Sequence, residues 1–200
     1  MQPLFYQEEE MKKTPYAVLI ILLVFISGVP TLADTTDNSS AEKVMDSVST
    51  AIDNGDLELS LEKLEGIQKE GLTAENLSRL HFLQGKAVYI KVSADIKSCR
   101  LEGTQKRFEL QEYQIEPLVS ALNHLNKAYE LSPDSDWAPE ALYAAGLIQD
   151  SSCLQRFGGA MDSYWTLAEK YPDTDLGKAA RQKYDYLRSR MDQKGHGQHP

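Results

Sequence analysis

The chain is poor in positive charge relative to negative charge. It has 21 lysine and arginine residues against 30 aspartate and glutamate residues, so its formal net charge is −9 at pH 7. Nucleic acids and anionic lipid surfaces attract proteins through patches of lysine and arginine. The composition therefore argues against both as partners, although it does not by itself identify one.

The sequence also lacks an unbroken apolar run of the length that a membrane span needs, about 20 residues. The apolar run near the N-terminus covers residues 17–26, follows two lysines, and is followed by a small-x-small pattern at residues 31–33. These three features together are typical of a secretory signal peptide. We therefore predict a signal peptide at residues 1–33, with Met11 as an alternative start, and no stable membrane span after cleavage. An uncleaved anchor in the inner membrane is the alternative.

Catalytic motifs are missing as well. The sequence has no Gly-x-Ser-x-Gly elbow, no phosphate loop, no dinucleotide fingerprint and no His-Glu-x-x-His pair. His81 and His124 have no metal-ligand spacing, and we interpret them as ordinary surface or helix-interface residues. His196 and His199 lie in a tail without further ligands. The sequence therefore predicts a protein that is not an enzyme and has no cofactor and no metal.

What the sequence does contain is a repeat. A shift of 39 positions places Ala121 on Ala160 and Leu125 on Tyr164, and it aligns the segment 133–136 (Pro-Asp-Ser-Asp) with 172–175 (Pro-Asp-Thr-Asp). A period of this size indicates units that bury their apolar faces by stacking on neighbours.

Apolar residues recur at helical spacing along most of the chain. A polar, disordered lead-in is expected at residues 34–40, and a flexible tail at 192–200. Asn54-Gly55-Asp56 predicts a turn between the first two helices, and Pro117 is expected in the first turn of a helix. The predicted helices cover about residues 44–52, 57–67, 77–90, 116–131, 137–149, 156–171 and 176–191.

The paired helices resemble tetratricopeptide repeats. In that family small residues let the two helices of a unit approach closely, and a proline follows the second helix. The residues that carry the resemblance are Gly85, Ala121, Leu125, Ala128 and Pro133 in one unit, and Leu142, Ala145, Gly146, Ala160, Tyr164, Leu167 and Pro172 in the next. It implies an all-α, short helical solenoid: a degenerate hairpin at 41–74, a hairpin at 75–136 with an insertion at about 92–115, a hairpin at 137–175, and a capping helix at 176–191.

The same resemblance implies a binding face. In tetratricopeptide proteins the first helix of each unit lines the concave side, where extended or helical peptides dock. The positions carried over to this sequence are Met45, Ser49 and Ile52 in the first unit, Arg79, Phe82, Lys86 and Tyr89 in the second, and Glu140, Tyr143 and Leu147 in the third.

The expected function is therefore an exported, periplasmic or secreted scaffold that binds a protein or peptide in the cell envelope. Short segments are similar to exported bacterial repeat proteins associated with the Tol–Pal system or with outer-membrane assembly. The alternatives are an accessory subunit of an envelope enzyme or assembly complex, and a self-associating structural protein, such as a homo-oligomer formed through residues 41–72.

The chain has only two cysteines, Cys99 and Cys153. Exported proteins meet oxidising conditions. Cys153 is expected in the helix–helix turn of the third unit, and Cys99 beyond the corresponding turn of the second. Because such turns line one edge of a repeat stack, the two could form a disulfide, with two unpaired thiols as the alternative.

We expect this bond to close a loop of roughly 55 residues and to contribute about 4 kcal/mol to stability by restricting the unfolded chain. Thiol labelling of protein purified from the exporting compartment, with and without reductant, tests the pairing. Labelling of both cysteines without reductant would show that the bond is absent.

Overall fold

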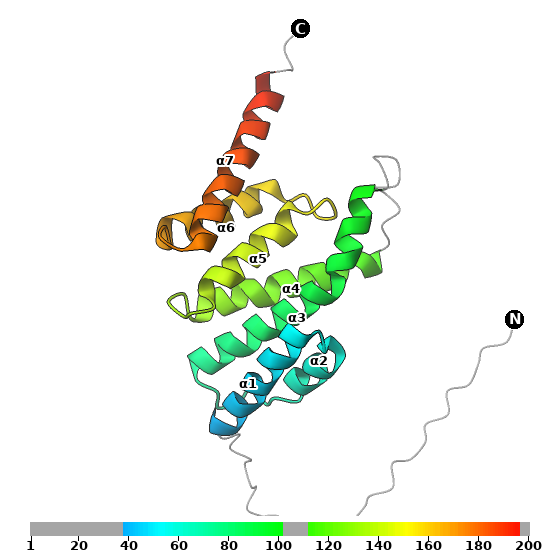
Figure 1. Ribbon diagram of the computed structural model, residues 1–200, viewed down its shortest axis with the longest axis vertical. Helices are drawn as coiled ribbons and strands as arrows, with labels where there is room; N and C mark the ends of the chain where they lie inside the picture. Colours follow the sequence, from blue (N-terminus) through cyan, green and yellow to red (C-terminus); the bar gives the residue numbers. More distant parts are fainter. Residues whose placement is uncertain (1–37, 102–111, 197–200) are drawn as a thin grey trace, which may run out of the picture. The chain divides into compact units, whose positions relative to one another are not determined.

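The computed structural model describes residues 38–101 and 112–196, and throughout these ranges its regular structure is helical, without strands (Figure 1). The all-α prediction is confirmed. Side chains at 94–101, 112–114 and 194–196 lie outside the description. The helices are α1 (Asn38–Asn54), α2 (Leu57–Glu65), α3 (Ala74–Leu101), α4 (Glu112–Leu131), α5 (Ala138–Asp150), α6 (Phe157–Lys170) and α7 (Asp175–His196).

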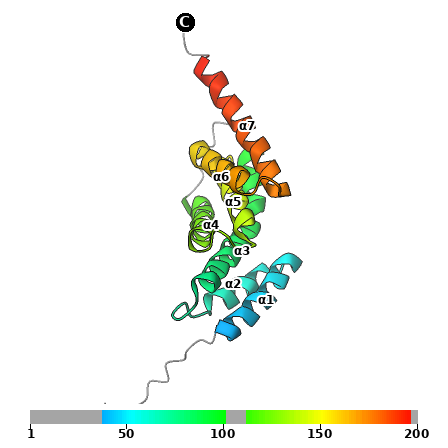
Figure 2. The same ribbon diagram turned by 90° about the vertical axis from the view of Figure 1, so that its left-hand side faces the viewer.

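Each helix packs on the next one along the chain, and the odd-numbered helices also contact one another in succession. Thus α1 contacts α3, α3 contacts α5, and α5 contacts α7. In Figure 1 the helices follow one another in order from α1 to α7, and in the turned view of Figure 2 α4 and α6 lie to one side of α3 and α7. The odd-numbered helices therefore form a row, and a surface along that row draws side chains from several helices.

The turn between α1 and α2 depends on a glycine. Gly55 has φ +89°, a left-handed conformation that residues with a Cβ rarely adopt. Its N–H donates to the Ile52 carbonyl over 3.0 Å, and the Asp56 N–H donates to the Ala51 carbonyl over 2.9 Å. These bonds satisfy carbonyls at the end of α1, so the chain reverses where the sequence predicts a turn.

Helix α1 begins at Asn38, inside the segment expected to be a disordered lead-in. The Asn38 side chain bonds to the connection between α2 and α3: its Oδ1 accepts from the Thr73 N–H at 3.1 Å and from Asn76 Nδ2 at 3.1 Å, and its Nδ2 donates to the Gly71 carbonyl at 3.3 Å. These contacts span more than 30 residues of sequence, so no local pattern could predict them. They hold the first turn of α1 in place.

Two other boundaries differ from expectation. Helix α4 begins at Glu112, so Pro117 lies inside the helix instead of in its first turn. An interior proline destabilises a helix, but it removes only its own N–H from the hydrogen bonds of the helix. Helix α7 continues through His196, so residues 192–196 of the expected flexible tail are helical. Within the expected insertion, residues 92–101 extend α3 and 112–115 begin α4, while 102–111 lie outside the described residues.

Two glycines pack tightly against a large side chain of the next helix. A Cβ placed on Gly85 would lie 2.8 Å from Leu125 Cγ, and a Cβ placed on Gly146 would lie 2.5 Å from Tyr164 Cε1. Leu125 and Tyr164 are 1 % and 0 % exposed. These two large residues are the ones that the 39-residue shift superimposes, so the repeat in sequence is a repeat in packing.

We predict that Gly146→Ala lowers the free energy of unfolding by about 1–3 kcal/mol, because the buried Tyr164 ring must move to admit the methyl group. Gly158→Ala is the matched control: Gly158 is also helical, but nothing lies within 4 Å of its added Cβ. Alanine is the better helix former, so this control should be neutral or slightly stabilising. Urea unfolding monitored by circular dichroism measures both, and equal stability of the two variants would contradict the close packing at Gly146.

Candidate functional site

A cavity of about 320 Å³ opens along the row of odd-numbered helices. Six of the ten residues that the resemblance places on a binding face line this one cavity. The other four, Met45, Ser49, Ile52 and Arg79, do not. Its lining is Phe82, Lys86, Tyr89 and Ile90 from α3, Leu125 from α4, Glu140, Tyr143, Ala144 and Leu147 from α5, and Leu176 from α7.

Helical periodicity explains why these side chains meet. Phe82, Lys86 and Tyr89 follow one another at intervals of four and three residues, so they lie on one face of α3. Glu140, Tyr143 and Leu147 have the same kind of spacing on α5. Gly85 follows Phe82 by three residues and packs against Leu125, which also lines the cavity, and Gly146 follows Tyr143 by three residues and packs against Tyr164. The glycine contacts therefore lie next to the predicted stripe, and the contact at Gly85 brings Leu125 into the cavity wall.

Four lining residues were not predicted from the sequence: Ile90, Leu125, Ala144 and Leu176. Ile90 and Ala144 each directly follow a predicted residue, and a cavity that lies between two helices reaches these positions beside the predicted stripe. Leu125 belongs to the second helix of its hairpin, and Leu176 to α7, so their positions depend on packing between helices that are distant in sequence. No local pattern separates them from ordinary core leucines.

Three of the predicted positions have other roles. Arg79 forms an ion pair with Asp46 of α1 at 2.6 Å and does not line the cavity. Met45 and Ile52 are 0 % and 2 % exposed, so the expectation that they line a binding face is wrong. They form part of the core instead, because the face of α1 that carries them packs against α2 and α3.

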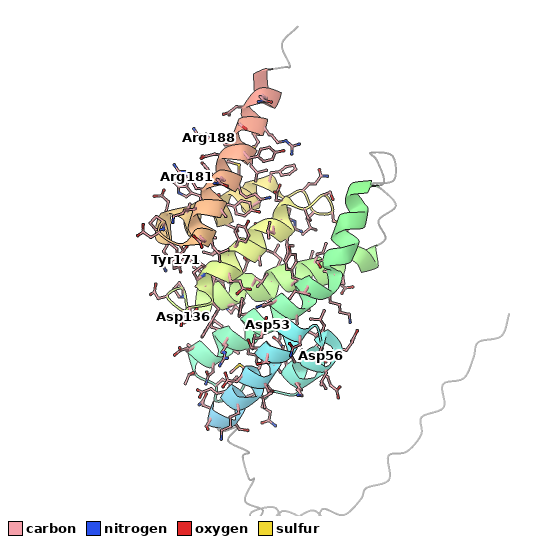
Figure 3. The ribbon with its side chains drawn as sticks, in the orientation of Figure 1. Asp53, Asp56, Asp136, Tyr171, Arg181 and Arg188 are labelled. Atoms are coloured by element: carbon pink, nitrogen blue, oxygen red, sulfur yellow. The ribbon has the colours of Figure 1, made fainter. Side chains whose placement is uncertain are left out.

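Lys86 provides the charge beside the cavity. Its Nζ lies 3.3 Å from Asp53 Oδ1 of α1 and 3.2 Å from Glu140 Oε1 of α5, and 5.8 Å from the centre of the Phe82 ring. Figure 3 labels Asp53 at the end of α1. Burial lowers the Lys86 pKa, but the charges and hydrogen bonds of Glu140 and Asp53 outweigh it, so the pKa is raised above its usual 10.5. The ammonium group thus links three helices of the row.

The aromatic part of the lining is half-buried or buried. Phe82 is 7 % exposed, and Tyr89 and Tyr143 are intermediate. Burial raises the pKa of the Tyr89 hydroxyl, and the neighbouring Tyr143 raises it further. Tyr143 also contacts the core through Tyr164, with ring centres 6.0 Å apart. The cavity walls are therefore largely apolar, some of the lining side chains pack against the core, and one cluster of charged groups lies beside them.

A second cluster joins the two helices of the middle hairpin. His81 Nδ1 of α3 lies 2.9 Å from His124 Nδ1 of α4, with ring centres 5.1 Å apart. The pKa of His81 is lowered to about 4, chiefly by burial and also by the charges of His124, Lys69 and Lys127. Burial and the charge of Lys69 also lower the pKa of His124. The histidines are interface residues, as expected, but the sequence did not indicate that they contact each other.

Cys153 is disulfide-bonded and packs against the larger core cluster. The side chain of Cys99, near the C-terminal end of α3, lies outside the described residues, so its predicted pairing with Cys153 stays a prediction.

In residues 38–101 and 112–196, no group of three histidine, cysteine or acidic side chains is placed to hold a metal ion. No helix in the same ranges is long and apolar enough to cross a membrane.

No protein-family model matches the chain, and it matches neither a curated protein nor a solved structure.

The histidine pair predicts an acid-sensitive hairpin. Because the pKa values of the histidines are lower in the folded protein, the unfolded chain binds more protons as the pH falls below about 6.5. The free energy of unfolding therefore has its full value above about pH 6.5 and decreases as the pH falls from there through about 4. Between pH 7 and pH 5 we expect His81→Gln to lose about 1 kcal/mol less stability than the wild type, allowing for solvent screening of a partly exposed ring. Urea unfolding at both pH values measures the difference. Equal losses in the two proteins would contradict the prediction.

Proposed function

We propose that this protein is an exported, non-catalytic scaffold of tetratricopeptide-like hairpins that binds a segment of another polypeptide in the cavity between α3 and α5. One observation carries the proposal. Residues chosen from sequence as a binding face, separated by more than 50 positions, line a single cavity of about 320 Å³. This volume is at the lower end of the range for ligand pockets, about 300–1,000 Å³, which suits an apolar side chain of a peptide.

The packing of the helices supports this proposal. The first helices of successive hairpins contact one another in a row, and the small residues Gly85 and Gly146 bring each second helix close. The row ends at α7, where Asp185 corresponds to Gly146 at the 39-residue shift. Arg181 and Arg188 are exposed on the same helix (Figure 3). A charged face in place of a small residue is what a capping helix requires.

The chemistry of the cavity favours binding over catalysis. A lysine or tyrosine acts as a base or nucleophile near neutral pH only when its pKa is lowered toward 7. Here the pKa values of Lys86 and Tyr89 are both raised, so both side chains hold their protons. Aromatic residues around a desolvated pocket are instead the usual anchors of protein–protein interfaces.

The disulfide at Cys153 supports export, since disulfides persist in the oxidising compartments outside the cytoplasm. The predicted signal peptide falls at residues 1–33, outside the described residues. The alternative of a dimer through residues 41–72 receives less support. Within residues 41–72 the one large apolar side chain that is exposed is Leu59 of α2, so this region offers little apolar area to a second copy.

Peptide selection tests the proposed function. We expect a displayed library of random short peptides, selected on the purified protein, to yield sequences with large apolar residues. The affinity of the best synthetic peptide, measured by fluorescence anisotropy, should fall about tenfold or more in Tyr143→Ala.

Tyr186→Ala is the matched control, because Tyr186 is 56 % exposed on α7 and does not line the cavity. Since Tyr143 also touches the core, Ala144→Phe provides a second variant that fills the cavity without removing a core contact. A selected peptide whose affinity is unchanged in both cavity variants would refute the proposed site.

A further inference from the structure

We infer that the segment bound in the cavity carries lysine or arginine beside its apolar anchor, an inference that rests on the proposed function. It follows from the orientation of the ion pairs that α3 forms with α1 and α5. Their basic members are shielded by the protein, and their acidic members face solvent.

The exposed fractions show this orientation. The Arg79 and Lys86 side chains are 25 % and 21 % exposed, whereas their partners Asp46, Asp53 and Glu140 are 66 %, 63 % and 48 % exposed. A ligand that approaches α1, α3 and α5 from solvent therefore meets carboxylates first. An acidic ligand would have to place its charges against them.

The unused hydrogen-bond acceptors of Asp53 and Glu140 also favour a basic ligand. An ammonium group has three donors and no acceptor, and Lys86 directs its ammonium to both Asp53 and Glu140. A carboxylate has about four acceptor positions, so each of these acids keeps capacity for another donor. The cluster of Lys86 with two carboxylates also carries a net charge of −1. A basic residue of the ligand would both neutralise this charge and use the remaining acceptors.

Glu140 places a negative charge beside the apolar part of the cavity. Glu140 lines the cavity together with Phe82 and Tyr143, so a carboxylate lies at the edge of an apolar space. A peptide with a large apolar side chain in the cavity would bring its neighbouring residues near this carboxylate. Charge complementarity at such a rim contributes mainly to specificity and to the association rate.

Three labelled peptides test the inference. They share the apolar anchors of a peptide selected on the wild-type protein, and they differ only in flanking residues, which are lysine, glutamine or glutamate. Measured by fluorescence anisotropy at low salt, the lysine peptide should bind about tenfold tighter than the glutamine peptide, and the glutamate peptide should bind most weakly. Added salt should reduce the advantage of lysine.

A charge-neutralising double variant locates the effect. Asp53→Asn with Glu140→Gln should bring the lysine and glutamine peptides to within about twofold of each other. The control, Glu62→Gln with Asp162→Asn, removes the same charge from exposed positions that do not line the cavity, and it should keep the full preference for lysine.

The outcomes separate the two proposals. If the lysine and glutamine peptides bind equally and both lose affinity in Tyr143→Ala, the charge inference is wrong and the pocket stands. Tighter binding of the glutamate peptide would likewise overturn the inference. If no peptide of the series loses affinity in Tyr143→Ala or Ala144→Phe, the proposed function fails and the inference fails with it.

Discussion

The structure depends on the close approach of paired helices at Gly85 and Gly146. At each glycine a large side chain of the second helix, Leu125 or Tyr164, occupies the space where a Cβ would otherwise lie. Small residues at a crossing allow helices to pack at short interaxial distances, and the contact also fixes the rotation of each helix about its axis. That rotation turns Phe82, Lys86 and Tyr89 of α3, and the corresponding face of α5, toward the cavity.

The charged groups depend on the same arrangement. Lys86 reaches Asp53 of α1 and Glu140 of α5 because α1, α3 and α5 lie in a row. Exposed ion pairs of this kind contribute little to stability, typically 0–1 kcal/mol each. What they share is their orientation: the bases lie toward the protein and the acids toward solvent. The proposed preference for a basic ligand rests on this orientation.

Much of the candidate site could be predicted because the chain resembles a family of paired-helix repeats. Phe82, Lys86, Tyr89, Glu140, Tyr143 and Leu147 were predicted from that resemblance, and all six line the cavity. Arg79 has the same spacing but pairs with Asp46 away from the cavity. Spacing identifies a face of one helix, but it does not show how far a neighbouring helix covers that face.

The sequence by itself determined the helical class, the positions of the helices, the glycine turn after α1 and the small residues at which hairpins close. These features follow from local propensity and from periodicity within a few turns of chain. Only the tertiary structure decided that Met45 and Ile52 are core residues, that His81 meets His124, and that Leu125 and Leu176 complete the cavity wall. Each of these depends on contacts between helices separated by tens of residues, and no local pattern encodes such contacts.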